Sequence, residues 1–385
     1  MADLAMERVR FLETWRRTAE EAGRVHGREI ADLSPSEWWA KMASDPKYRS
    51  YGTLVYLLEK VHDDLAEQPV NARELAAVVV AFVDDVDTLD PLYRETLRGE
   101  AWKERANALK VTGDLRGALD AAERAMAILG ARASLAYCLA KAELAAAQVL
   151  QQMGRSDEAI ALARGAAVMF KDHSDTVYYG HARMTEAWVL FSRKQTREAM
   201  QIFVDRARET EESGDMLNLA RALHCTGACA RELGDLAAAR DFFARSLSRY
   251  AQFGNAVAAE VPKVRWSYAL LLAAAEQTDE ALAELDKVEA ELLRVGMNTD
   301  AAIAALDIVR LRFERGEDVT RFCSGLVLRF ANAGMTQNAI EALAYVREEA
   351  RTGRLSLGTI EKVRGYLREL PKRPNLAFLR AEDGR

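Results

Sequence analysis

Few side chains in this 385-residue sequence combine the types and the spacing that chemistry needs. His224 and Cys225 are adjacent, and Cys229 follows one helical turn later, so the two thiols share a helix face and could form a metal-binding or redox pair. No second Cys-x-x-Cys or His pair supplies the remaining ligands, and cysteine is also a common small residue in buried helix packing. We therefore expect buried cysteines, no metal site and no cofactor.

Other candidates for catalysis are isolated in the sequence. Carboxylates cluster in His62-Asp63-Asp64 and in Asp84-Asp85 with Asp87, and such clusters are usually solvated helix ends. His26, His173 and His181 have no Ser or Cys arranged for nucleophilic catalysis. No phosphate-binding loop, G-x-S-x-G motif or H-E-x-x-H motif occurs. The sequence therefore predicts a protein that is not an enzyme.

The composition restricts the class of protein. Ala and Leu carry most of the hydrophobic half, with only 7 Pro and 22 Gly, which favours helix and predicts almost no strand. A net charge of -6 gives no basic footprint for direct binding of nucleic acid. The first residues are charged where a signal peptide needs an apolar core, and the apolar stretches are too short to cross a bilayer. We expect a cytoplasmic protein with no membrane partner.

Most of the candidate histidines and cysteines lie within a repeated sequence motif, and the helices of that repeat must position them. GDLRGALDAAERA from Gly113 returns as GRSDEAIALARGA from Gly154 and as GDLAAARDFFARS from Gly234. Each phrase reads as a tight turn followed by an amphipathic helix. With Lys194, Glu276 and Gly316 at the equivalent turn position, the successive steps are all about 40 residues, in the range of helical-hairpin repeats.

Two columns of small residues flank the turns and indicate close helix crossings. A small side chain at the middle of each helix of a hairpin lets the two backbones approach, which a Leu or Phe would prevent. The column before the turn contains Ala106, Ala147, Ala187, Gly227 and Ala269, and the column after it contains Ala118, Ala159, Ala199, Ala239 and Ala281.

This pattern of small residue, glycine turn and alanine resembles the tetratricopeptide repeat in a longer form. That form is similar to the repeats of bacterial signalling proteins, such as peptide-sensing quorum regulators and the repeat domains of large transcription activators. The resemblance implies an all-α, right-handed α-solenoid over residues 50–352. A helical extension at 1–49 precedes it, and a capping helix with a tail follows at 353–385.

Some repeats depart from the pattern. Lys194 and Glu276 replace the turn glycine, which is tolerable if these residues need not adopt positive φ. The sixth unit has Val309 and Arg321 in the two small columns, so we expect it to pack more loosely or to end the array.

Outside the array, the sequence predicts helices at both ends. One long helix is expected over 2–25, and Ser34-Pro35 begins a short one. A divergent first hairpin is expected from residues 50–68 and 71–87, and a last hairpin from 336–351 and 358–370. In the tail that follows, Leu376, Phe378 and Leu379 could dock.

The resemblance places the functional surface on the concave face, which is lined by the first helix of each hairpin. An acidic protein here carries cations and tryptophans, which suits an acidic partner with apolar anchors. Lys103 and Asn107 also have the spacing of the family's carboxylate clamp, although Ala145 stands where that clamp has Asn. The alternative is that the tryptophans are core residues and the cations are merely solvated. The predicted partner-binding residues are Lys103, Asn107, Lys110, Lys141, Gln148, His181, Met184, Trp188, Arg221, Arg231, Lys263 and Trp266.

The sequence therefore predicts a non-catalytic scaffold or regulator that binds a peptide or helix of a partner protein. The alternative is a component of a bacterial effector or defence system, as the substrate or inhibitor of a partner protease or other enzyme. An intact stoichiometric partner would favour the first interpretation, and a protease that cuts one loop would favour the second.

Overall fold

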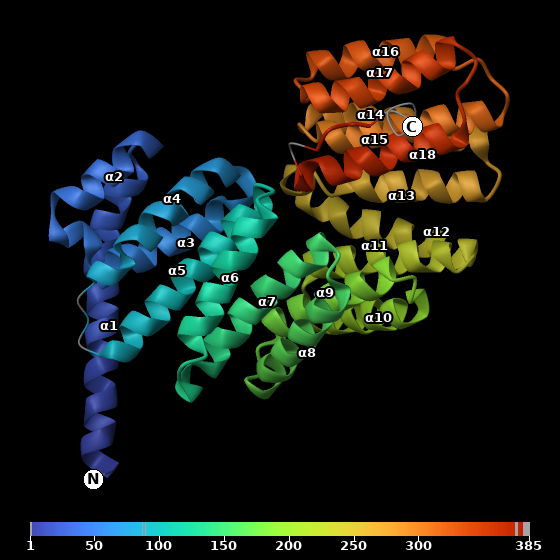
Figure 1. Cartoon of the computed structure of the whole chain (residues 1–385). Helices are drawn as coiled ribbons and strands as arrows, with labels where there is room; N and C mark the ends of the chain where they lie inside the picture. Colours follow the sequence, from blue (N-terminus) through green and yellow to red (C-terminus); the bar gives the residue numbers. More distant parts are fainter. Residues whose placement is uncertain (1, 87, 89, 374–375, 380–385) are drawn as a thin grey trace. The chain divides into compact units, whose positions relative to one another are not determined.

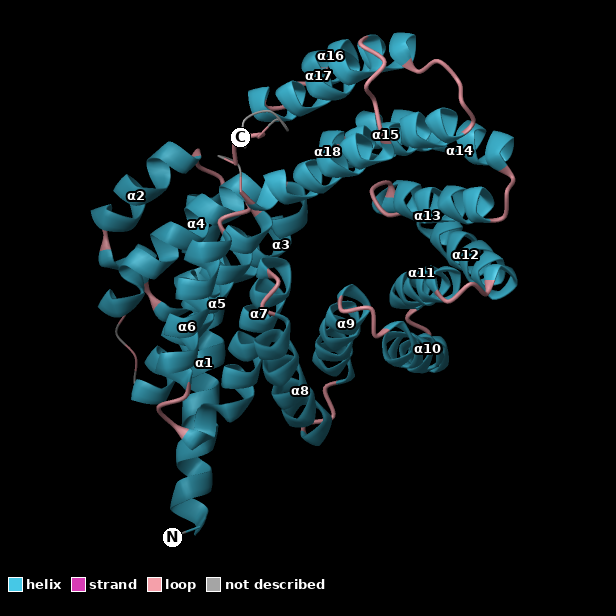
Figure 2. Cartoon of the chain, turned by 45° about the vertical axis from the view of Figure 1, so that its right-hand side comes forward, coloured by secondary structure: helices cyan, strands magenta, loops and turns pink. Residues whose placement is uncertain are grey.

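The computed structural model describes residues 2–86, 88, 90–373 and 376–379, and within these ranges the chain forms helices and turns and no strand (Figure 2). The α-helices are α1 (Ala2–Ala31), α2 (Pro35–Ser44), α3 (Tyr51–Glu67), α4 (Pro69–Phe82), α5 (Pro91–Val111), α6 (Leu115–Leu129), α7 (Ala136–Met153), α8 (Ser156–Asp172), α9 (Thr176–Ser192), α10 (Thr196–Ser213), α11 (Met216–Glu232), α12 (Leu236–Tyr250), α13 (Val261–Ala274), α14 (Thr278–Arg294), α15 (Asn298–Glu314), α16 (Thr320–Asn332), α17 (Gln337–Arg351) and α18 (Leu357–Glu369). Short 3-10 segments are η1 (Pro46–Arg49), η2 (Val83–Asp85), η3 (Ala133–Leu135), η4 (Ala251–Val257) and η5 (Leu370–Lys372). No helix in the described ranges is long and apolar enough to span a membrane.

The chain divides into two compact units, Met1–Val189 (unit 1) and Leu190–Arg385 (unit 2), and the division falls within α9. Unit 1 includes the hairpins α5–α6 and α7–α8, and unit 2 includes α11–α12 and α13–α14 (Figure 1). The expected division at 1–49, 50–352 and 353–385 stays a prediction.

The small residues of the two predicted columns are buried. The nine alanines have no exposed surface, and Gly227 is buried in α11. A Cβ added at Gly227 would lie 2.7 Å from the ring of Phe243 in α12, so glycine is what lets these two helices approach. The columns therefore mark helix contacts, as the sequence predicts.

The turns between the helices share one conformation. Gly113, Gly154 and Gly234 all have positive φ, in the left-handed region that glycine adopts without strain. Lys194 and Glu276 adopt it too, with φ of 64° and 60°. The condition under which a residue other than glycine is easily tolerated there is therefore not met, because the tight turn sets the backbone conformation whichever residue occupies it.

The amino-terminal helix is longer than expected, since α1 runs to Ala31. Gly23 does not end the helix but provides a close contact: a Cβ added there would lie 2.1 Å from the backbone of Gly52 in α3. A Cβ on Gly52 would in turn lie 1.9 Å from the carbonyl oxygen of Ala19. The two glycines bring α1 and α3 together, so the extension packs on the first hairpin.

The carboxyl-terminal helices pair differently from the expected last hairpin. The helices α17 and α18 form close to the predicted bounds, but α18 also packs along α15, and α16 packs against α17. Val309 in α15 is fully buried and Arg321 in α16 is exposed. A fully buried aliphatic residue and an exposed arginine thus occupy the two columns in this unit, and the expectation that the array ends here stays a prediction.

The described part of the tail docks on α17 and α18. The carbonyl oxygen of Leu376 accepts hydrogen bonds from Tyr366 Oη at 2.6 Å and from Asn338 Nδ2 at 3.2 Å. The Phe378 ring lies 5.0 Å from the ring of Tyr366 between centroids, whereas Leu379 is 68% exposed. Residues 374–375 and 380–385 lie outside the described ranges.

Candidate partner-binding surface

In unit 1, Lys103 is buried and already neutralised. Its Nζ lies 2.5 Å from Glu100 Oε2 and 2.7 Å from Glu104 Oε1, all within α5. Burial opposes the charge of Lys103, but the two carboxylates outweigh it and raise the pKa of Lys103 above its usual value. Burial likewise opposes ionisation of Glu104, yet Lys103 and the hydrogen bonds to that carboxylate lower its pKa to about 2. The predicted clamp lysine is therefore part of a buried ion-pair network.

Asn107, Lys110 and Gln148 form a polar row that links α5 to α7. Asn107 Nδ2 donates to Glu104 Oε2 at 3.1 Å, and Lys110 Nζ donates to Gln148 Oε1. Burial lowers the pKa of Lys110 to about 8, with Glu104 partly opposing the change. Three of the predicted residues thus contact one another directly or through a shared neighbour.

Lys141 lies between two aromatic rings that the sequence interpretation missed. Its Nζ is 4.9 Å from the centroid of Tyr137 and 4.8 Å from that of Tyr178. Tyr137 Oη donates to Asp175, which also accepts from the backbone N–H of Tyr178 at 2.9 Å. The ring of His181 lies 6.2 Å from Tyr178. Tyr137 and Tyr178 are not among the residues predicted from the sequence, and only their proximity to Lys141 in the fold identifies them.

The remaining predicted residues of unit 1 lie on α9. Met184 is half-buried, and Trp188 is 37% exposed. Glu186 on the same helix is buried and accepts from Arg164 Nε of α8 at 2.7 Å. Trp188 thus keeps apolar surface that a partner could cover.

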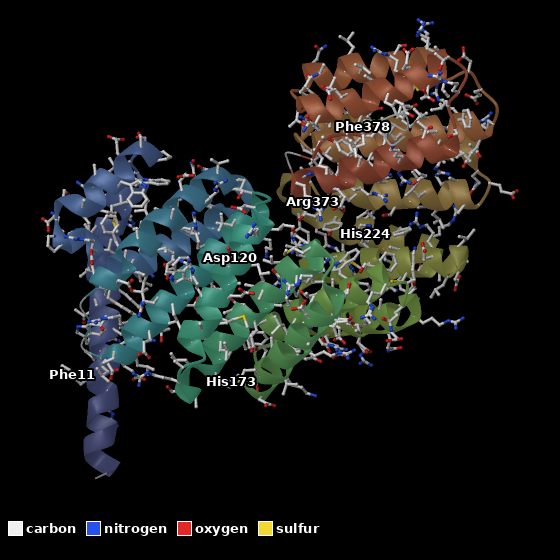
Figure 3. The ribbon with its side chains drawn as sticks, viewed as in Figure 1. Phe11, Asp120, His173, His224, Arg373 and Phe378 are labelled. Carbon is white, nitrogen blue, oxygen red and sulfur yellow. The ribbon has the colours of Figure 1, made fainter. Side chains whose placement is uncertain are left out.

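In unit 2, Arg221 and His224 on α11 have polar partners. Arg221 Nη2 donates to Glu260 Oε1 at 3.0 Å, and His224 Nε2 lies 2.8 Å from Ser267 Oγ of α13. Burial, followed by the charges of Lys263 and Arg231, lowers the pKa of His224 to about 4. His224, labelled in Figure 3, is therefore neutral at pH 7.

Trp266 on α13 is half-buried and anchored to a buried acid. Its Nε1 donates to Asp307 Oδ2 at 2.9 Å, and Asp307 has no exposed surface. Arg364 Nη2 of α18 lies 3.0 Å from Asp307 Oδ1, and Arg310 Nε lies 3.8 Å from it. Burial raises the pKa of Asp307, while Arg364, Trp266 and Arg310 oppose that rise. The sequence interpretation missed Asp307 and Arg364.

Arg231 and Lys263 have no hydrogen bond or ion pair among the described residues. Burial lowers the pKa of Arg231; Glu232 and Asp307 oppose this change, and the charges of Arg364 and Arg310 add to it. Lys263 is exposed on α13. Two of the predicted residues therefore carry charges that the fold leaves available.

The cysteines that opened the sequence analysis are buried thiols. Cys225 is 5% exposed and Cys229 is fully buried, and both are free. Burial raises the pKa of the Cys229 thiol to about 12, so it is not a reactive thiolate. No group of three or more metal-ligating side chains occurs within the described ranges.

Three carboxylates of the two acidic clusters form ion pairs. Asp64 is 8% exposed and pairs with Lys60 at 2.6 Å, so the expectation of a solvated helix end was wrong for this residue. Asp84 pairs with Arg98 at 2.6 Å, and Asp85 pairs with Arg49 at 3.3 Å. Residue 87 of the second cluster lies outside the described ranges.

Comparisons with known proteins find similar solved structures but no similar sequence family. No protein-family model matches the sequence, and neither does any curated protein. Aspartyl phosphate phosphatase F from Bacillus subtilis is similar in structure, with a TM-score of 0.57 at 14% identity over 74% of this chain and 71% of that chain. The apo form of the quorum sensor NprR from B. thuringiensis has a TM-score of 0.56 at 15% identity, over 86% of this chain and 91% of that one. The apo form of RapI has a TM-score of 0.56 at 12% identity, over 80% and 99%.

The chain has the tetratricopeptide-type α-solenoid fold. The predicted fold class is thereby confirmed. The predicted partner-binding set stays a prediction: its members from Lys103 to Trp188 lie in unit 1, and those from Arg221 to Trp266 lie in unit 2.

Proposed function

We propose that this protein is a non-catalytic scaffold or regulator that binds a peptide or helix of a partner protein on the first helices of its hairpins. The observation that carries the proposal is in unit 2, where Arg231 and Lys263 form no hydrogen bond or ion pair among the described residues, and Lys263 lies one helical turn before the half-buried Trp266 on α13. Unpaired cations next to partly exposed aromatic surface favour an acidic segment with an apolar anchor. In unit 1, Lys141 and Trp188 offer the same combination of charge and apolar surface.

The similar structures support this proposal at the level of fold. One of them is named a quorum sensor, and such a role requires recognition of a signal. Another is named a phosphatase, so the fold itself is compatible with catalysis. The non-catalytic assignment rests instead on this chain's own residues, since the described cysteines are free and Cys225 and Cys229 are buried.

A peptide-display selection tests the proposal directly. Random peptides from a display library are selected on the full chain, and their binding is then measured by fluorescence anisotropy. The expected peptides are acidic with one or two apolar anchors, and they lose binding to the Trp188→Ala or Arg231→Glu variant. Unchanged circular dichroism of both variants shows that the fold is retained. Selected peptides that bind both variants as well as the original chain would contradict the proposal.

Purification of complexes from the source cells separates the proposal from its alternative. An intact partner in stoichiometric amount supports a scaffold. A protease that co-purifies and cuts the chain at one loop supports instead a substrate or inhibitor within an effector or defence system.

A further inference from the structure

Side-chain contacts in unit 2 bring four helices to one place. His224 of α11 contacts Ser267 of α13 at 2.8 Å. On the same helix as Ser267, Trp266 donates to Asp307 of α15 at 2.9 Å. Asp307 in turn pairs with Arg364 of α18 at 3.0 Å. A surface formed by α11, α13, α15 and α18 therefore has a fixed polar framework at its centre.

Positive charge exceeds negative charge around that framework. Arg310 and Arg364 share the buried Asp307, and each also pairs with an acid farther out, Glu314 and Glu361 respectively. Three further cations have no hydrogen bond or ion pair among the described residues, and they are Arg231, Lys263 and Arg368. Two further carboxylates act on these groups: Glu232, which pairs with Lys194, acts on Arg231, and Asp300, which has no bonded partner among the described residues, acts on Lys263 and Arg368.

One guanidinium of this cluster is held away from bulk water. The side chain of Arg364 is only 12% exposed, and its Nε atom is buried and has no hydrogen-bond partner in the described structure. Arg368, one turn further along α18, is exposed, so its guanidinium can contact a bound segment. Partial burial and the charge of Arg364 lower its pKa, with Asp307 opposing. Guanidinium groups with unused donors in such a place are well suited to a planar or tetrahedral oxyanion.

We infer that Arg231, Lys263 and Arg368, next to the Trp266–Asp307–Arg364 cluster, form a binding site for an oxyanion carried by the partner segment. This inference rests on the proposed function and specifies its ligand: a carboxylate side chain or a phosphorylated side chain, which share the same acceptor chemistry. Asp307 orients Arg364 and Trp266 from beneath, and Asp300 limits how much negative charge the site accepts.

The site is tested with two probes, inorganic phosphate and an acetylated, amidated tetraglutamate peptide, titrated calorimetrically into the full chain at low salt. The test variant is Arg231→Gln with Arg368→Gln. Its matched control is Arg208→Gln with Arg294→Gln on α10 and α14, which removes the same charge from helices outside the site. Losing charged hydrogen bonds should weaken the preferred probe by about tenfold or more, whereas the control should change it less than about twofold.

The preferred probe identifies the source of the oxyanion. Tighter binding of phosphate supports a phosphorylated side chain, and tighter binding of tetraglutamate supports carboxylates. If the double variant is poorly folded by circular dichroism, Lys263→Gln replaces it, because Lys263 is exposed and its removal leaves the core intact.

Equal weakening in the test and control variants, or no saturable binding of either probe, would overturn the oxyanion site. The proposed function is judged separately by the display-selected peptides. Peptides that lose binding to Trp188→Ala but bind Arg231→Gln/Arg368→Gln normally would leave the scaffold standing and remove this site.

Discussion

At the scale of single residues, Glu276 occupies a turn that its side chain does not suit. Its φ of 60° lies in the left-handed region of the backbone dihedrals, where the Cβ crowds the backbone at a cost of roughly 1–2 kcal/mol for an L-residue. The residue is exposed and forms no side-chain hydrogen bond or ion pair among the described residues. Nothing local offsets the strain, so the position tests how strictly the repeat requires glycine.

Replacing Glu276 by glycine should stabilise the protein. Relief of the left-handed strain exceeds the extra chain entropy that glycine loses, so we expect a gain of about 1 kcal/mol. For a unit of this size the melting temperature should rise by roughly 2–4 °C in calorimetry. Gly234→Ala is the matched control: φ is 84° there, and no atom would touch the new Cβ, so only the strain is added and the melting temperature should fall. A Glu276→Gly variant that melts lower would contradict the turn geometry.

His224 should make the protein sensitive to mild acid. Its pKa of about 4 lies below the unfolded value near 6.5. Between these two pH values the unfolded chain therefore binds a proton at this residue and the folded chain does not. Stability is therefore lost as the pH falls from 6.5 towards 4, by about 2 kcal/mol at pH 5. Urea denaturation at pH 7 and pH 5 should show this loss, and His224→Gln should lose less.

The opposite behaviour of His62 makes that comparison necessary. Glu104, whose Oε1 lies 3.7 Å from His62 Nδ1, raises the pKa of His62, with burial opposing, so this group adds stability as the pH falls. Because both histidines titrate in one curve, only the difference between the original chain and His224→Gln isolates His224. Equal losses in the two proteins would show that His224 is not buried neutral.

At the scale of helices, the two columns of small residues could be predicted from sequence, because a recurring interval aligns them. The capping box at Ser34 was predictable too, from Pro35 and Glu37. The packing of α18 along α15 could not be predicted from the sequence. Its buried Ile360 and Val363 predict an apolar face, but an apolar face does not identify the helix that covers it. The Asp307–Arg364 pair depends on that packing, so this part of the candidate site could not be predicted either.

Gly227 and Gly165 lie inside helices for different reasons, and alanine should separate them. A Cβ at Gly227 would lie 2.7 Å from the ring of Phe243, so Gly227→Ala should cost roughly 1–3 kcal/mol through forced repacking. A Cβ at Gly165 would meet no atom, so Gly165→Ala should gain about 1 kcal/mol from helix propensity alone. Thermal unfolding of both variants gives the sign, and a neutral Gly227→Ala would mean that α11 and α12 do not cross closely there.

At the scale of the whole molecule, the charge of the protein and the charge of the proposed surface have opposite signs. The chain carries a net charge of -6, yet Arg231, Lys263 and Arg368 form no direct ion pair among the described residues. These cations make the proposed surface locally attractive to an acidic partner during its approach, even though the net charge of the chain is negative. Neither composition nor net charge could reveal this, because pairing depends on which side chains meet after folding.

Association of an acidic peptide should therefore respond to salt mainly through its rate of binding. At about 0.15 M ionic strength the Debye length is roughly 8 Å, so added salt screens the attraction during approach more than the contacts formed after docking. Stopped-flow measurements with a display-selected peptide should show the association rate constant falling by about tenfold from low to high salt, with a smaller change in dissociation. In Arg231→Glu both the fast association and its salt dependence should be lost.

The control variants are charge reversals at Arg164 and Arg208. These residues already pair with Glu186 and Asp205, so reversing either charge should leave the salt dependence unchanged. If those two reversals remove the effect and Arg231→Glu does not, the partner binds the second helices of the hairpins, and the proposed surface is wrong.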